Sequence, residues 1–153
     1  MPETDATSTD FASTSLARAA EVPVPEADVL AGRFPLTANP SPVAEDERAA
    51  VLAGLHFGDC FTDHMAHARW RQGEGWGDYG VVPYGSLSLS PAAAVLHYGQ
   101  EIFEGIKAYR HEDGSVWTFR PRYNAARLNA SARRMALPEL AEEDFVASLV
   151  DLV

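Results

Sequence analysis

The sequence predicts an α+β fold, in which a mostly antiparallel sheet between about residues 60 and 120 is joined to flanking helices. Three observations predict it. Residues 60–71 and 81–90 alternate apolar and polar side chains, an Asp-Gly pair separates two further strand-like segments, and two segments of helical period follow residue 120. With 153 residues, the chain is long enough for one ordinary domain with a single core.

The composition narrows the classes of function. Hydrophobic residues make up 46% of the chain and charged residues 22%, as in globular proteins, and no apolar run has the length of a membrane-spanning helix. The formal net charge of −10 argues against nucleic acid as the main partner, because phosphate binding needs a basic face. The polar, acidic N-terminus lacks the features of a secretory signal, so we expect a cytoplasmic protein.

The N-terminal segment differs from the rest of the chain. Residues 1–42 are rich in Ala, Pro, Ser, Thr and acidic residues without a sustained helical or strand period, which predicts a flexible arm, disordered or extended. Residues 45–55 contain helix-forming residues with Val51, Leu52 and Leu55 on one side, and predict a short helix. We therefore expect the folded domain to occupy residues 43–153.

The middle of the chain predicts strands. Residues 60–71 predict one strand, and residues 81–90 predict a second, in which Leu87 and Leu89 alternate with serines. The glycine-rich residues 71–80 between them predict a loop. Further on, Asp113 and Gly114 lie between residues 104–111 and 115–120, which predicts a β-hairpin because glycine accepts the positive φ of a tight turn.

Two helices are expected at the C-terminal end. Pro121 suits a first helical turn, and the apolar residues that follow keep helical spacing until Pro138, which predicts a helix up to residue 137. Residues 142–153 predict a last helix with one apolar face. Since this helix has no capping signal before Val153, we expect the chain to be truncated there.

No metal site or catalytic nucleophile is predicted. Cys60 is the only cysteine, so it cannot form an internal disulfide, and it is expected to be a small buried side chain. His64, His67 and His97 have no acid or thiol at metal-ligand spacing.

Three runs occur in a fixed order with little sequence between them: FGDCFTDHMAHARW (57–70), LHYGQEIFEGIKAYR (96–110) and FRPRYNAARLNASARRMALP (119–138). Together they resemble the branched-chain amino-acid aminotransferases, pyridoxal-phosphate enzymes of fold type IV. The resemblance covers roughly residues 55–153. It implies that the chain is the small N-terminal domain of such an enzyme.

The resemblance also implies roles for four residues. Arg127 is implied to bind the phosphate of pyridoxal 5'-phosphate, and a permanently charged guanidinium suits a phosphate dianion. Tyr98 and Phe103, together with Phe57, are implied to line the pocket for the substrate side chain. Without the resemblance, Arg127 would be interpreted as one of five arginines on a solvated helix face, and the aromatic residues as part of a core.

The catalytic lysine of the family has no counterpart here. The only lysine is Lys107, and in the family's pattern this position is not the residue that holds the cofactor, which lies in a second domain. We interpret Lys107 as an exposed or edge-facing strand residue, and Glu104 and Gly105 as residues that shape the strand without a catalytic role. The chain alone is therefore expected to be inactive.

The resemblance implies a homodimeric enzyme that transfers the amino group of leucine, isoleucine or valine to the 2-oxo acid 2-oxoglutarate. Two alternatives remain at this point. One is another fold-type IV enzyme, a D-amino-acid aminotransferase or an aminodeoxychorismate lyase. The other is a non-catalytic binding or assembly module, suggested by the missing lysine and by the arginine-rich residues 120–134.

Overall fold

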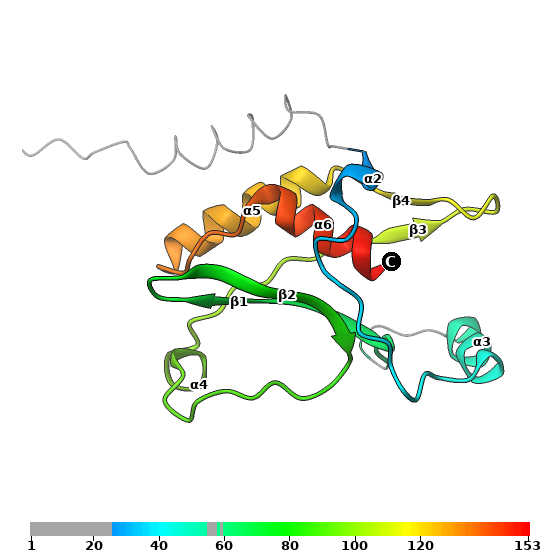
Figure 1. Cartoon of the computed structure of the whole chain (residues 1–153), viewed down its shortest axis with the longest axis horizontal. Coiled ribbons are helices and arrows are strands. Elements are labelled where there is room, and N and C mark those ends of the chain that lie inside the picture. Colours follow the sequence, from blue (N-terminus) through cyan, green and yellow to red (C-terminus); the bar gives the residue numbers. More distant parts are fainter. Residues whose placement is uncertain (1–25, 55–57, 59) are drawn as a thin grey trace, which may run out of the picture.

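The computed structural model describes residues 26–54, 58 and 60–153. A long antiparallel strand pair forms its centre, with helices packed on one face (Figure 1). The α+β class is confirmed, although the strands form two separate two-stranded sheets, β1-β2 and β3-β4. The elements, in order, are α2 (Ala27–Leu30), α3 (Glu45–Ala53), β1 (His64–Arg71), β2 (Gly75–Pro83), α4 (Ala94–Tyr98), β3 (Ala108–Arg110), β4 (Val116–Thr118), α5 (Pro121–Arg134) and α6 (Glu142–Leu152).

The β1-β2 hairpin corrects two predictions. Residues 71–80 were expected to form a loop, but the turn occupies only residues 72–74, where Gly73 has φ 87°, and β2 already begins at Gly75. The second strand was expected over residues 81–90, and it ends at Pro83. Pairing with β1, for example Trp70 opposite Trp76, outweighs the low strand propensity of the glycines in β2.

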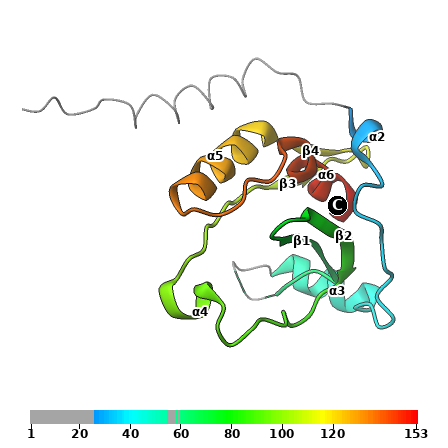
Figure 2. The ribbon, with the colours of Figure 1, turned by 60° about the vertical axis from the view of Figure 1, so that its left-hand side comes forward.

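The hydrophobic core lies between β1-β2, α6 and the segment that contains α2. In both views α6 lies over the strand pair and α5 lies next to α6 (Figures 1 and 2). The buried core residues are Leu30, Phe34, Val81, Val146 and Ala147. Two of them come from residues that the sequence assigned to a flexible arm, so the packed part of the chain includes residues before 43.

Hydrogen bonds attach this N-terminal segment to the rest of the domain. The backbone N–H of Thr37 donates to the carbonyl of Val81 (2.8 Å), so the segment lies along β2. The Asp151 carboxylate of α6 accepts the backbone N–H groups of Gly32 (2.7 Å) and Phe34 (2.8 Å). The bond to Phe34 satisfies an N–H group of a buried residue, and all three bonds hold the segment against β2 and α6.

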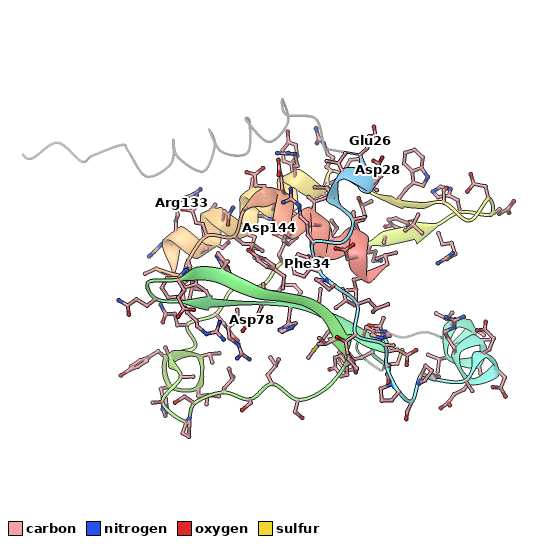
Figure 3. The ribbon with its side chains drawn as sticks, in the orientation of Figure 1. Glu26, Asp28, Phe34, Asp78, Arg133 and Asp144 are labelled. Atoms are coloured by element: carbon pink, nitrogen blue, oxygen red, sulfur yellow. The ribbon has the colours of Figure 1, made fainter. Side chains whose placement is uncertain are left out.

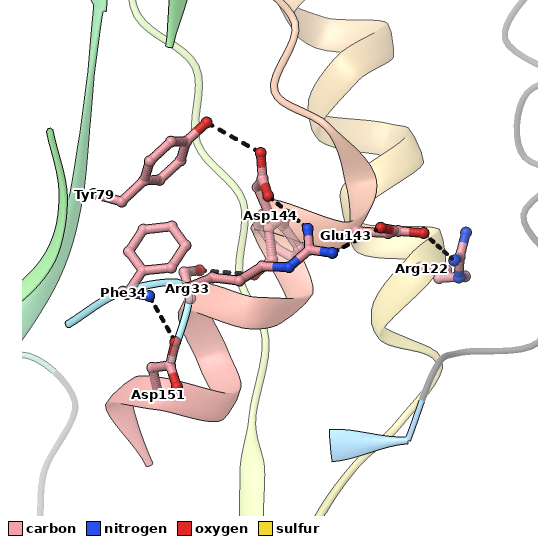
Figure 4. Close-up of polar contacts among 9 residues, drawn as sticks. Arg33, Phe34, Tyr79, Arg122, Glu143, Asp144 and Asp151 are labelled. Carbon is pink, nitrogen blue, oxygen red and sulfur yellow. Dashed lines mark hydrogen bonds and ion pairs between the residues drawn. The ribbon is translucent and has the colours of Figure 1, made fainter. Parts of the chain in front are cut away.

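A charged network links the same segment to α5 and α6 (Figure 4). Arg33 bonds to Asp144 (2.9 Å) and Glu143 (3.1 Å), while the Tyr79 hydroxyl donates to the other oxygen of Asp144 (3.0 Å). Burial, followed by the bond to Asp144, raises the pKa of Tyr79. The buried Arg122 of α5 lies 4.0 Å from Glu143. Figure 3 shows Phe34 and Asp144 between the strand pair and the helices.

The hairpin and the helices agree with the sequence. Strand β3 pairs with β4, with Tyr109 opposite Trp117, and Gly114 in the turn has φ 84°. The helices α3, α5 and α6 lie within about three residues of the predicted ranges, and α5 starts at Pro121 as expected. Cys60, expected to be buried, is exposed. Within the described residues, no helix combines the length and apolar character needed to cross a bilayer.

Candidate functional site

The segment between α4 and β3 runs alongside α5 (Figures 1 and 2). Near one end of the segment, the Gln100 side-chain amide donates to the carbonyl of Met135, just after α5 (2.8 Å). Nearer its other end, the Asn124 side-chain amide donates to the carbonyl of Gly105 (2.8 Å). From Gln100 to Gly105 the extended chain covers about 17 Å, and from Asn124 to Met135 the helix covers about the same length. Because Gln100 bonds near the end of α5 and Gly105 near its start, the two bonds hold the segment extended and antiparallel to the helix.

Side chains alternate along this segment as in a β-strand. Ile102, Glu104 and Ile106 are partly buried, whereas Phe103 and Lys107 are exposed. Successive side chains of an extended chain point to opposite sides. This alternation places Glu104 between two apolar residues on the side that α5 covers, and it leaves Lys107 on the exposed side, as the sequence predicted.

Glu104 forms a bidentate ion pair with Arg127. The Arg127 Nε donates to Oε2 (2.7 Å) and Nη2 donates to Oε1. The Asn124 side chain (2.9 Å) and the backbone N–H of Gly105 (3.0 Å) donate to the same Oε1. The side chain of Glu104 is only 4% exposed, whereas that of Arg127 is 62% exposed. A buried carboxylate therefore fixes one edge of an exposed guanidinium.

The pKa values reflect this pair. The bond from Arg127 lowers the pKa of Glu104 in spite of its burial, and the bond from Asn124 adds to the effect. In return, Glu104 raises the pKa of Arg127. Both groups are therefore charged at neutral pH.

The sequence interpretation missed Glu104, to which it gave no functional role. A signal for it exists in the printed sequence. An acidic residue at the inward position of an alternating apolar segment, between Ile102 and Ile106, requires a cationic partner because an unpaired buried carboxylate is costly. The nearest motif rich in arginine is FRPRYNAAR.

Arg127 also borders an open depression of about 320 Å³ at the start of α5. The pair with Glu104 uses Nε and Nη2, and Nη1 has no protein partner among the described residues. Arg120 lines the same depression, with its Cζ atom 4.5 Å from the centroid of the Tyr123 ring. The other lining residues are Phe119 and Asn124. Such a surface offers several N–H donors and positive charge to an anion.

Two of the predicted substrate residues, Tyr98 and Phe103, lie elsewhere on the surface. Tyr98 is the last residue of α4, and both it and Phe103 are 86% exposed. Neither lines the depression at Arg127. Phe57 lies outside the described residues. Phe103 directly precedes Glu104, so of the two described aromatic residues it is the one next to the ion pair.

No group of three or more His, Cys, Asp or Glu side chains that could hold a metal ion occurs in the part of the chain that the structure describes.

The fold and this surface define an α+β domain that presents an oriented arginine beside a basic depression. No family profile matches the chain. Individual proteins do match. The chain is 52% identical over 120 residues to the branched-chain-amino-acid aminotransferase of Mycolicibacterium smegmatis, and the aligned residues make up 78% of the chain and 33% of that protein. It is 55% identical over 112 residues to a probable branched-chain-amino-acid aminotransferase of Streptomyces coelicolor, which covers 73% of the chain and 31% of that protein.

The similarity extends to eukaryotic proteins. The chain is 43% identical over 116 residues to the mitochondrial branched-chain-amino-acid aminotransferase of Saccharomyces cerevisiae, covering 76% of the chain and 28% of that protein. The chain is therefore similar to one part of the branched-chain-amino-acid aminotransferases, as its motifs predicted. It spans about a third of the length of the relatives that it matches.

Proposed function

We propose that the chain forms part of a transaminase that moves the amino group of leucine, isoleucine or valine to 2-oxoglutarate with pyridoxal 5'-phosphate as cofactor. The observation that carries this proposal is the orientation of Arg127, whose position in the N-x-x-R motif is joined to the HYGQEIFEG motif through Glu104. Two of the motifs on which the resemblance rests are thus in contact through the Glu104–Arg127 ion pair.

The residues at the depression fit the phosphate group of this cofactor. A phosphate monoester carries nearly two negative charges at neutral pH and three acceptor oxygens. Arg127 keeps unpaired N–H groups for these oxygens while Glu104 holds its other edge, so little orientational freedom remains to be lost on binding. In this proposal Arg127 binds the phosphate and Glu104 positions Arg127.

When bound, pyridoxal phosphate supplies the electron sink that lets an amino acid lose the proton of its α-carbon. The residues of this chain do not touch that proton in our proposal. Arg127 anchors the cofactor through its phosphate, and Tyr98 and Phe103, together with Phe57, form an apolar wall for the branched side chain of the substrate. Large rigid aromatic rings suit this purpose because they bury much area with few rotatable bonds.

The remaining parts of the site belong, in this proposal, to other parts of a homodimeric, cytoplasmic enzyme. The reacting lysine is one of them, since Lys107 is exposed and lies on the side of its segment opposite Glu104. We expect the 153-residue chain to transfer no amino group from leucine to 2-oxoglutarate. A coupled assay for glutamate formation tests this, and turnover by the chain alone would contradict it.

The arrangement of charges disfavours the alternative of a nucleic-acid-binding module. Among the five arginines of residues 120–134, three form ion pairs with carboxylates: Arg122 with Glu142, Arg127 with Glu104 and Arg133 with Glu139. Pairing cancels most of the charge that a phosphodiester chain would meet. Other fold-type IV activities are separated by comparing L-leucine with D-alanine as the amino donor of the whole enzyme.

The phosphate role of Arg127 is tested directly on this chain. Pyridoxine 5'-phosphate is a suitable probe because it carries the same phosphate and ring but no aldehyde, so it cannot react with Lys107. We expect it to shift the Arg127 side-chain signal in NMR titrations, and Arg127→Gln to weaken binding by roughly tenfold, the loss of one charge-assisted contact. Arg110→Gln, on the exposed strand β3, is the matched control. Equal affinity in both variants would rule out the role.

A further inference from the structure

We propose that Arg120 is a second anion-binding residue in the depression at Arg127, and that it supplies the net positive charge of the site. The proposed ligand class is a phosphate monoester. This inference rests on the proposed phosphate role of Arg127 and adds a residue to it.

The net positive charge of the depression comes from Arg120 and not from Arg127. Arg127 is paired with the buried carboxylate of Glu104, so the two charges sum to zero. Arg127 can orient an anion through directed N–H groups, but the pair offers it little net attraction. Arg120 lines the same depression, and among the described residues the ion pairs near the start of α5 involve Arg122 and Arg127 but not Arg120. Its guanidinium is therefore the uncompensated charge at this place.

Stacking holds Arg120 in position. Its guanidinium carbon lies 4.5 Å from the ring centroid of Tyr123 and 5.7 Å from that of Phe119. An arginine stacked on aromatic rings keeps its N–H groups free for hydrogen bonds in the plane of the guanidinium. The aromatic rings therefore restrain Arg120 without occupying its N–H donors. Arg127 is restrained by Glu104, which occupies only one edge of its guanidinium.

The two arginines have complementary parts in the proposed site. Arg127 supplies direction, because Glu104 leaves one defined edge free, and Arg120 supplies charge. Arg120 is also the residue before the first turn of α5, a 14-residue helix whose amino end adds a partial positive charge. A phosphate dianion placed in the depression would meet both guanidiniums.

The matched pair for the test is Arg120→Gln and Arg134→Gln. Both remove one positive charge from an exposed arginine at an end of α5, and the ends lie about 20 Å apart, beyond the screening length at ordinary salt. We expect Arg120→Gln to weaken the binding of inorganic phosphate and of pyridoxine 5'-phosphate at least about fivefold, and Arg134→Gln to change it less than about twofold. Arg120→Lys keeps the charge and should retain most of the affinity.

NMR titration of the full chain separates the outcomes. If phosphate shifts Arg127 in the unaltered chain but Arg120→Gln and Arg134→Gln bind it equally well, the role of Arg120 is refuted and that of Arg127 stands. If phosphate shifts neither arginine, the phosphate role of Arg127 and this inference both fail. The backbone amide spectrum of each variant shows whether its fold is retained. If Arg120→Gln unfolds, Arg120→Met, which keeps an apolar stem and removes the charge, carries the test with the same expected loss of affinity.

Discussion

Two regions of the domain differ in how far their phenylalanine side chains are exposed to solvent. In the packed region, formed by residues 27–37, β1-β2 and α6, Phe34 is 3% exposed and meets the Tyr79 ring edge-on. In the open region, formed by residues 98–107, β3-β4 and the start of α5, Phe103 and Phe119 are largely exposed. Burial of apolar area stabilises the first region, whereas the second keeps apolar area available for other contacts.

The largest expected effect is on the free energy of unfolding, when a phenylalanine of each region is replaced by alanine. Phe34→Ala should lower the free energy of unfolding by about 3–5 kcal/mol, because it leaves a cavity in the core. Phe103→Ala should change it by less than about 0.5 kcal/mol, because the ring is exposed. Denaturant unfolding followed by tryptophan fluorescence measures both values. Similar losses in the two variants would mean that the open region is as important for stability as the core.

The next effect concerns the polar contacts of the packed region. Asp151→Ala should cost about 2 kcal/mol, since it leaves the backbone N–H groups of Gly32 and Phe34 without their acceptor. Asp28→Ala removes an exposed carboxylate from α2 nearby and serves as the control, with an expected change of less than about 0.5 kcal/mol. Faster amide hydrogen exchange at residues 32–34 in the first variant alone would identify the lost bonds as the cause.

The comparison also explains which parts of the fold the sequence could predict. The β3-β4 turn, α5 and α6 depend on local signals, an Asp-Gly pair and a proline followed by helical spacing, and these predictions are confirmed. The prediction failed for β2, where cross-strand pairing keeps glycines in a strand. Residues 26–42 likewise have few local signals, and Leu30 and Phe34 are buried through contacts with distant strands and α6.

The candidate site was predictable only in part for a similar reason. The motifs point to Arg127, but its partner Glu104 is 23 positions away, and their contact depends on the extended segment lying beside α5. No periodicity within either motif carries that information. The roles given to Tyr98, Phe103 and Phe57 remain predictions.

Glu104 differs from the aromatic residues of the open region, because its side chain is only 4% exposed whereas Phe103 beside it is 86% exposed. Glu104→Gln keeps the shape of the side chain and replaces two charge-assisted bonds to Arg127 with at most weaker neutral ones, so it should lower the free energy of unfolding by about 1–2 kcal/mol at pH 7. Glu101→Gln, on the exposed side of the same segment, is the control and should change it by less than about 0.5 kcal/mol.

The dependence on pH distinguishes the charge of Glu104 from its packing. Arg127 lowers the pKa of Glu104 in the folded chain below its ordinary value of 4.5, so the unfolded chain binds the proton more readily. The stabilising contribution is therefore complete above the ordinary pKa and disappears as the pH falls through the lowered one. The difference in unfolding free energy between the unaltered chain and Glu104→Gln should shrink over that acidic range. A difference that stays constant down to pH 3 would assign the effect to packing and would remove the electrostatic basis for Glu104 as the residue that positions Arg127.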